Sequence, residues 1–539
     1  MYQGKFLYFI ESKKNLIVVV FFISLFILGL TIFRDYGIHT DEYHNQHAGK
    51  RIFTYLQSIP GSGLGSGPEL TEYEYRHGLL FETFLQYAQS FLRSTDARDI
   101  LYMRHFFTFF IFYIGAMFFY LLCAYYFKSW KAGLLGVSLL FLHPPIFCYA
   151  FLNSVDIPFL SFYIIGTFTL FRFLDKQSFA NATIHGLATA LAMSIRLAGG
   201  IIFAATVIFT VFSLIAGKRD KLDLRKVTKN LIWYILFLFL LLIAFYPTFW
   251  SNPFPHFVTA FRSSMFFDYY FPIALSYKSE WFYVPLWLFI TTPEFCIFLF
   301  ITGLFVALAY LIHPVKATDF NRRNAWVVIF VLFAPIILSI AVKTKHFNNW
   351  RHFLFIYPSF IIFSIFGLYK LWDSICLLSK LFLRRLLKIG LVLCMVTGFF
   401  VTINFMIIYH PFQLIYRSEF AYLFARRVKD FNFLDHWYLT FPTAIGEIIK
   451  HDPDKVIAVY GVQDFVLDAL TPAQRTRILL TGDPRQAKYA IFLNQPDRNP
   501  RKYITFKTED NQRINVPVKQ ECYSIPYRNV KAVAVYTLN

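Results

Sequence analysis

Apolar runs, each close to the length of a membrane-spanning helix, recur along most of the chain. A helix needs about 20 mainly apolar residues to cross a bilayer. The first run, 16–33, follows Lys13 and Lys14 and ends without a small-residue cleavage site, so it predicts an uncleaved helix rather than a signal peptide. The other runs fall at 105–127, 132–150, 157–174, 181–198, 200–217, 230–247, 285–312, 325–342, 353–371 and 389–409. The pattern therefore predicts about eleven transmembrane helices.

Positive charges mark the two sides of this predicted bundle. If the N-terminus is cytoplasmic, the alternate loops that are also cytoplasmic carry clusters of Lys and Arg, as such loops usually do. These residues are Lys128, Lys131, Arg172, Lys176, Lys218, Arg219, Lys221, Arg225, Lys226, Lys229, Lys316, Arg322, Arg323, Lys380, Arg384, Arg385 and Lys388. We therefore expect a multi-pass protein of the cytoplasmic (inner) membrane, whose odd number of helices leaves the C-terminus outside the cytoplasm.

Two large segments are expected on the outer face. The first outer loop, 34–100, contains a flexible glycine-rich stretch at Gly61–Gly67 and an amphipathic stretch at 79–92 that is expected to lie along the membrane surface. The second segment follows a transmembrane module formed by 1–409. Residues 410–539 have an ordinary soluble composition with short β-like runs, which predicts a C-terminal extracytoplasmic α/β domain. Those runs are 455–460, 477–480, 489–493 and 531–538.

The composition supports the membrane class and excludes others. Charged residues make up 16% of the chain, whereas soluble domains carry about 25%. The net charge of +20 comes from loop clusters without any nucleic-acid-binding motif, so we expect no nucleic-acid partner. The six cysteines are scattered without a CxxC pair, which argues against a disulfide framework and a thiolate metal site.

Three acidic residues stand out at the outer ends of helices. Asp41 and Glu42 follow the first helix closely, and Asp156 lies at the outer junction of the third and fourth helices. A carboxylate beside an apolar wall has a raised proton affinity, which suits a general base. The alternatives are an ordinary loop acid at Asp41 and a helix N-cap at Asp156, which Ile157-Pro158 would suit.

Basic residues are expected on the same side. Arg104 opens the second helix, Arg196 ends the fifth, and Arg351-His352 opens the tenth. Lys and Arg are usually concentrated in cytoplasmic loops, so positive residues at outer helix ends need an explanation. Binding of a lipid phosphate would account for them. The alternative is snorkelling of single arginines to headgroups.

A metal site is a further alternative near Asp41. His39, His44 and His47 supply ligand types that zinc uses, but their spacing fits no standard helical ligand pair. A divalent cation held by the acids is the other form of this hypothesis.

The order of these landmarks resembles the integral-membrane GT-C glycosyltransferases that use polyprenyl-phosphate sugars. The nearest branches are the bacterial relatives of the protein O-mannosyltransferases (family 39) and of the lipid A aminoarabinose transferases. His352 stands where the family usually has Tyr, and 451–539 match no named module. The matching segments are Asp41-Glu42, Met103-Arg104-His105, His143-Pro144 with Asp156, Trp281–Pro285 with Thr292-Pro293, Asn349–Pro358, His410–Tyr416 and Phe431–Tyr438.

The resemblance implies transfer of a hexose or pentose from a polyprenyl-phosphate donor to an acceptor hydroxyl on the outer face, with inversion. It gives Asp41 the role of base, and it gives Glu42 and Asp156 contacts with the sugar or acceptor. Binding of the departing lipid phosphate falls to four basic residues, which are Arg104, Arg196, Arg351 and His352. The acceptor (a glycan, a lipid or a protein) is left open.

Two other functions compete with the transferase. A transporter or lipid flippase would favour charges near the membrane midplane and an internal repeat, and the sequence has neither. A non-catalytic assembly or sensor protein would leave Asp41 and Asp156 unexplained.

Overall fold

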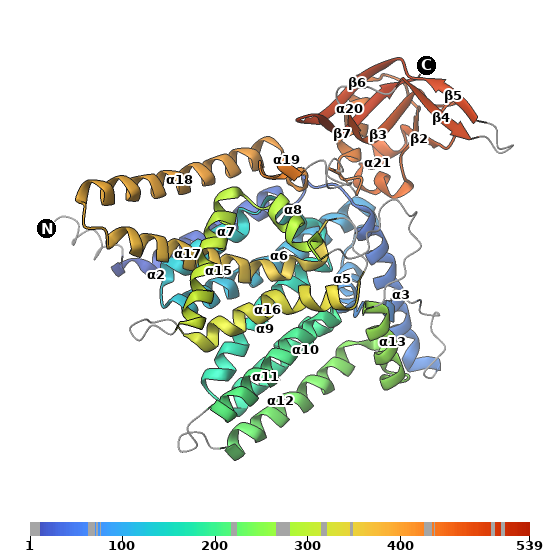
Figure 1. The fold of residues 1–539 in the computed structure, drawn as a ribbon. Coiled ribbons are helices and arrows are strands. Elements are labelled where there is room, and N and C mark those ends of the chain that lie inside the picture. Colours follow the sequence, from blue (N-terminus) through green and yellow to red (C-terminus); the bar gives the residue numbers. More distant parts are fainter. Residues whose placement is uncertain are drawn as a thin grey trace.

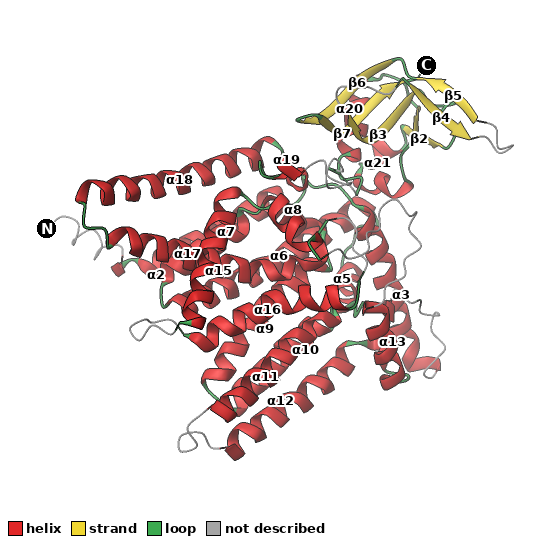
Figure 2. Cartoon of the chain, in the orientation of Figure 1, coloured by secondary structure: helices red, strands yellow, loops and turns green. Residues whose placement is uncertain are grey.

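The computed structural model describes residues 11–62, 71, 74–75, 77–216, 224–265, 281–313, 321–344, 349–424, 434–435, 437–496, 502–507 and 513–538. Part of the predicted glycine-rich stretch (63–67) lies outside these ranges, as do Lys218, Arg219, Lys221 and Lys316. The chain forms a large helical bundle, and a sheet built from the C-terminal residues stands at one end of it (Figure 1). Among the residues that the structure describes, the strands are confined to that end (Figure 2).

Every apolar run predicted from the sequence falls on a helix. Within the described ranges, nine helical segments are long and apolar enough to cross a membrane, or ten if the bent pair α7 (Trp130–Phe141) and α8 (Pro144–Leu152) counts as one. The chain is thus a multi-pass membrane protein. The nine are α2 (Lys14–Ile32), α6 (Ala97–Phe127), α9 (Asp156–Asp175), η1 (Leu197–Gly199) with α11 (Gly200–Ala216), α12 (Leu224–Phe245), α15 (Glu294–Ile312), α16 (Arg322–Ala341), η3 (Arg351–Ile356) with α17 (Tyr357–Cys376), and α18 (Leu381–Ile408).

Prolines divide two of the predicted runs. The third run bends by 76° between α7 and α8, where His143 precedes two prolines. The eighth separates at Thr292-Pro293 into α14 (Tyr283–Thr291) and α15. A residue before proline avoids the helical region, which explains both breaks. The fifth run forms the shorter α10 (Phe179–Met193), which packs between α9 and α12.

The segment predicted to form the first outer loop contains more helix than the sequence suggested. Its polar first half forms α3 (Thr40–Ser62), and the amphipathic stretch forms α5 (Leu80–Ser90). Helix α5 packs on α3 and α6 and buries Glu82 and Leu85, while Phe84 and Tyr87 are exposed. Its position along a membrane surface stays a prediction. Beyond α12, η2 (Pro247–Phe249) leads into α13 (Pro253–Met265).

The C-terminal residues form a mixed sheet with the strand order β2-β1-β3-β7-β6. The first three strands pair in parallel and the last three antiparallel, and β4 pairs with β5 in a separate ribbon. The predicted β-like runs are confirmed as β1, β2, β3 and β7. The elements after α18 are η4 (Gln413–Ile415), α19 (Ala421–Phe424), α20 (Phe441–His451), β1 (Ile457–Tyr460), η6 (Asp464–Ala469), α21 (Pro472–Arg475), β2 (Ile478–Thr481), β3 (Tyr489–Pro496), β4 (Tyr503–Lys507), β5 (Arg513–Pro517), β6 (Gln520–Tyr527) and β7 (Val530–Thr537).

The sheet region packs directly on the N-terminal ends of α3 and α6. Arg475 pairs with Asp96 at 2.5 Å, and Phe465 of η6 stacks on Tyr43 of α3 with ring centroids 5.4 Å apart. Ile38 is buried in the same apolar cluster as the inner side of the sheet. The contacts of Tyr43 and Ile38 hold the beginning of α3 against the C-terminal region. The boundary predicted at 409/410 stays a prediction.

Candidate active site

Asp41 and Glu42 lie in the first turn of α3, where the helix dipole favours carboxylates. His39 precedes the helix, and its Nδ1 accepts a hydrogen bond from the backbone N–H of Glu42 at 3.1 Å. The two acids point in different directions. The side chain of Asp41 is 28% exposed, whereas that of Glu42 is buried.

Asp156 is the first residue of α9 and is buried. The alternative in which it caps that helix is wrong, because the N-cap position is occupied by Val155, which makes no side-chain cap. Asn153 fixes this turn instead. Its Oδ1 accepts from the N–H of Asp156 at 2.7 Å, and its Nδ2 donates to the Asp156 carboxylate, also at 2.7 Å. Asp156 is therefore held at the N-terminal end of α9 and can form ion pairs.

Two arginines connect the acids. Arg196 Nη2 lies 2.5 Å from Asp156 Oδ1. Arg351 Nη1 donates to Asp41, and the same nitrogen lies 3.7 Å from Asp156 Oδ2. Asp156, Arg196 and Arg351 each stand at or next to the first residue of a candidate membrane span. The chain thus gathers these charges at the N-terminal ends of candidate spans.

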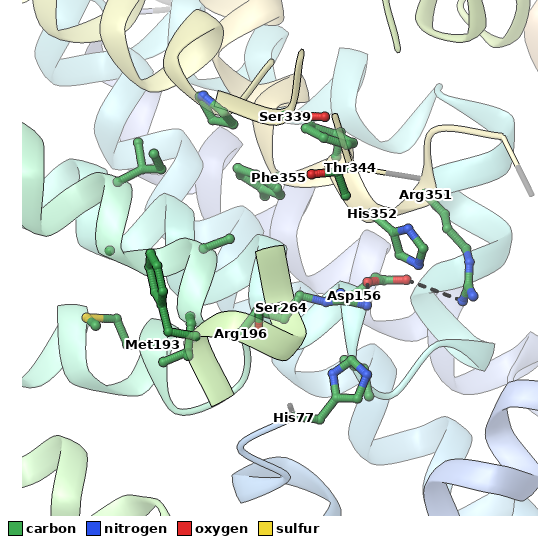
Figure 3. A pocket seen from close by; sticks show the side chains of 18 of the residues that line it. His77, Asp156, Met193, Arg196, Ser264, Ser339, Thr344, Arg351, His352 and Phe355 are labelled. Carbon is green, nitrogen blue, oxygen red and sulfur yellow. Dashed lines mark ion pairs between the residues drawn. The ribbon is translucent and has the colours of Figure 1, made fainter. Parts of the chain in front are cut away.

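A cavity of about 740 Å³ opens beside these charges. At one end it is lined by Asp41, Asp156, Arg196, Arg351 and His352. Figure 3 shows the labelled side chains of Asp156, Arg196, Arg351 and His352 around this space, with the ion pair between Asp156 and Arg351 dashed. The apolar walls come from α11, α12, α13 and α16 and include Phe203, Phe239, Phe257 and Leu338. The cavity therefore joins a charged end to an apolar one.

Glu42 and Arg104 are not among the residues that line this cavity. They belong to a buried cluster beside it, which we call the carboxylate cluster and define as Glu42, Glu82, Arg104, His105 and Ser154. Arg104 Nη2 donates to Glu82 at 2.8 Å, and Arg104 Nε lies 3.5 Å from Glu42. His105 Nε2 lies 3.2 Å from the same Glu42 carboxylate. Ser154 donates to Glu82. The cluster connects α3, α5, α6 and the turn before α9.

Burial shifts the pKa of two groups near the site, Glu82 and His39. The pKa of Glu82 is raised by desolvation, which its contacts with Arg104 and Ser154 only partly offset. The pKa of His39 is lowered, again chiefly by desolvation. A neutral His39 keeps Nδ1 as the acceptor that the Glu42 N–H requires.

Sequence reasoning did not single out Glu82, Asn153 or Trp437, although all three contact predicted residues. Glu82 is an acid on the buried face of an otherwise amphipathic helix, and that position is a signal the sequence contains. Trp437 places its ring 4.2 Å from the guanidinium of Arg351; it lies in Phe431–Tyr438, one of the segments that carry the resemblance, but that match indicates no contact with Arg351.

The structure does not assemble the residues of the metal hypothesis. Within the described ranges, no group of three or more His, Cys, Asp or Glu side chains could hold a metal ion. His39 is buried against Trp437. His44 and His47 are exposed. The six cysteines are free.

Comparisons with known proteins returned solved structures only, since no family model and no curated protein matches the chain. The apo oligosaccharyltransferase of Archaeoglobus fulgidus matches with 12% identity and a TM-score of 0.49, over 87% of this chain and 65% of that one. ArnT from Cupriavidus metallidurans bound to undecaprenyl phosphate matches with 12% identity and a TM-score of 0.48, over 96% of this chain and 97% of that one. The present chain thus spans about two thirds of the oligosaccharyltransferase. ArnT is a lipid A aminoarabinose transferase, and both are enzymes of the GT-C fold, the group that the sequence resembles.

Proposed function

We propose that this protein transfers a sugar from a polyprenyl-phosphate donor to an acceptor hydroxyl on the outer face of the membrane. The observation that carries the proposal is the cavity with one charged and one apolar end. A lipid-linked sugar phosphate has the same division, with a charged headgroup on a long hydrocarbon. The apolar walls include α11, α12 and α16, which are candidate spans, so the hydrocarbon would lie at membrane depth.

The proposed orientation places the charged end outside the cytoplasm. The loops expected in the cytoplasm contact one another at the opposite ends of the helices: Arg323 pairs with Asp175, and Trp130 donates to Glu11 at 2.9 Å. Such a gathering of basic loops supports a single cytoplasmic side. The charged end of the cavity and the sheet region would then share the outer face.

Asp41 is the proposed base, because it lines the cavity and is more exposed than Asp156. Its carboxylate takes the proton of the acceptor hydroxyl while the hydroxyl oxygen bonds to the anomeric carbon. The bond from that carbon to the phosphate oxygen breaks, and the electron pair leaves with the lipid phosphate. Attack from the side opposite the phosphate inverts the anomeric carbon. A positioned base of this kind contributes about 10²- to 10⁴-fold to the rate.

Arg196, Arg351 and His352 are the proposed ligands of the departing phosphate. A guanidinium has five N–H donors, so each arginine can contact a phosphate oxygen and still keep its carboxylate partner. Donors aimed at the developing charge stabilise the transition state more than the ground state. Asp156 holds both arginines at this end of the cavity.

For Glu42 and Arg104 we propose a different role from contact with the donor. Both are buried in the carboxylate cluster. Glu42 directly follows Asp41, so its contacts with Arg104 and His105 fix the first turn of α3. In this account they position the base.

The test is transfer by the purified protein, reconstituted in vesicles, from a panel of radiolabelled polyprenyl-phosphate hexoses and pentoses to lipid and protein acceptors extracted from the host envelope. Acceptor-dependent release of the lipid phosphate, with label in the acceptor, supports the proposal. Movement of intact labelled lipid between leaflets without cleavage would instead identify a flippase and contradict it.

A further inference from the structure

Trp437 contacts Arg351 and the residue that precedes Asp41. Its ring lies 4.2 Å from the guanidinium of Arg351. Its backbone carbonyl accepts a hydrogen bond from the N–H of Thr40 at 3.3 Å, in the residue that begins α3 and precedes Asp41. Trp437 is 3% exposed. One buried residue therefore touches the turn that carries the base and the arginine that pairs with it.

The backbone around Trp437 is fixed by Asp435. The Asp435 carboxylate accepts from the backbone N–H of Trp437 at 2.8 Å and from that of Thr440 at 2.9 Å. It also accepts from the Thr440 hydroxyl at 2.8 Å. Because Asp435 is buried, these bonds are shielded from competing water. The backbone that carries the Trp437 ring is thus fixed by hydrogen bonds within its own turn.

The sheet region holds this turn through Asn494, a residue of β3. Its Oδ1 accepts from the N–H of Leu434 at 2.7 Å and from that of Asp435 at 3.1 Å, and its Nδ2 donates to the Asp435 carbonyl at 2.8 Å. Asn494 has a left-handed backbone (φ 53°), a conformation that asparagine tolerates better than most residues. Three hydrogen bonds of one side chain therefore tie the turn to the sheet.

Gly37 lets the chain before α3 approach the same segment from the other side. A Cβ at this position would lie 3.2 Å from the carbonyl oxygen of Leu439 and 3.1 Å from Cγ of Pro442. Both distances are tighter than ordinary contacts, so only glycine fits without a shift. Asp435 is thus held by the sheet, and Leu439 and Pro442 pack against the approach to α3.

We infer that Trp437 is a positioning residue for Arg351. We also infer that Asn494 and Asp435 make the position of Trp437 depend on the C-terminal sheet. The ring face of Trp437 holds the guanidinium by a cation–π contact where it reaches both Asp41 and the cavity. Asn494 and Asp435 keep the ring in place. The inference rests on the proposed function only in giving Arg351 a donor phosphate to bind; the placement of Arg351 itself does not depend on that function.

Hydrogen–deuterium exchange of the full-length protein measures this placement without any substrate. We expect faster exchange in η3 (Arg351–Ile356) for Trp437→Leu and for Asn494→Ala, and wild-type exchange for Trp437→Phe, which keeps an aromatic face. Asn494→Ala retains the tryptophan itself but removes the bonds that hold its turn, and it serves if Trp437→Leu fails to fold. The matched controls are Trp372→Leu, which removes a tryptophan–lysine contact elsewhere, and Asn515→Ala in β5. Wild-type exchange of η3 in folded Trp437→Leu or in Asn494→Ala would overturn the inference.

The rate of sugar transfer provides a second, independent test of the inference. Trp437→Leu should lower the rate about tenfold or more in the wild-type background and have little further effect in an Arg351→Lys background, because residues that act through one another are not additive. Full additivity would overturn the inference. Absence of transfer by the wild type with every donor would count against the proposed function, and the exchange arm would still decide the placement of Arg351.

Discussion

Arg351 donates to the carboxylate of Asp41 across 310 positions of sequence. The two residues belong to η3 and α3, and the same Arg351 nitrogen lies 3.7 Å from Asp156. The proposed base and the proposed phosphate ligand are therefore one charge pair at the charged end of the cavity. A change in the geometry of the arginine should affect both the leaving group and the base.

The first prediction concerns Arg351→Lys. Lysine keeps the positive charge but lacks the planar fork that reaches two acceptors at once. Since Arg351 contacts Asp41 and is proposed to contact the phosphate, we expect the transfer rate to fall about 10²- to 10³-fold. Arg322→Lys is the control, because Arg322 bonds the Leu311 carbonyl away from the cavity. Equal activity of the two variants would contradict the role given to Arg351.

The second prediction concerns the stability contributed by the carboxylate cluster. Glu82→Gln removes one charge from a fully buried pair with Arg104, and breaking such a pair costs about 3–5 kcal/mol. We expect a clear loss of thermal stability in detergent, measured by intrinsic fluorescence. Glu447→Gln breaks the more exposed pair with Lys450 and should cost about 0–1 kcal/mol. A Glu82→Gln protein as stable as Glu447→Gln would show that the cluster contributes little.

The third prediction is a pH dependence that originates at His39. Burial lowers the pKa of His39 in the folded protein, whereas in the unfolded chain it titrates at about 6.5. Below about pH 6.5 the unfolded state therefore binds more protons, so stability is lost as the pH falls from that value through the folded-state pKa. Protonation would also occupy Nδ1, which accepts from Glu42.

His39→Asn checks this origin, since asparagine offers an acceptor before the helix and does not titrate in this range. We expect unfolding midpoints between about pH 6.5 and 5 to decline less in His39→Asn than in wild type. His451→Asn, at an exposed position, should follow wild type. If the unfolding midpoints of wild type and His39→Asn decline in parallel as the pH falls, His39 is not the source of the pH dependence.

Much of the helical fold was predictable, because membrane helices need long apolar runs and such runs are visible without any tertiary information. Helix α3 was not predicted because its sequence is polar and contains no such run. It is stabilised by packing on α5 and by the C-terminal region, as in the Tyr43–Phe465 contact. Packing between distant segments cannot be read from local pattern.

The candidate site was predictable in part, for a related reason. Asp156, Arg196 and Arg351 attract attention because charges at the ends of apolar runs are costly and need partners. Glu82 and Trp437 acquire their roles only through partners that are far away in the sequence, namely Arg104 and Arg351. Which residues meet across the bundle is decided by the packing of its helices, and hydropathy does not specify that.

The role of Asp41 as the base is tested by comparing donor binding and sugar transfer in wild type and Asp41→Asn. The substitution removes the proposed base but keeps the size of the side chain, so undecaprenyl phosphate should still bind through Arg196, Arg351 and His352. We expect near-wild-type binding of undecaprenyl phosphate together with a loss of transfer of about 10²- to 10⁴-fold. Transfer at the wild-type rate by a normally folded Asp41→Asn protein would contradict this role of Asp41.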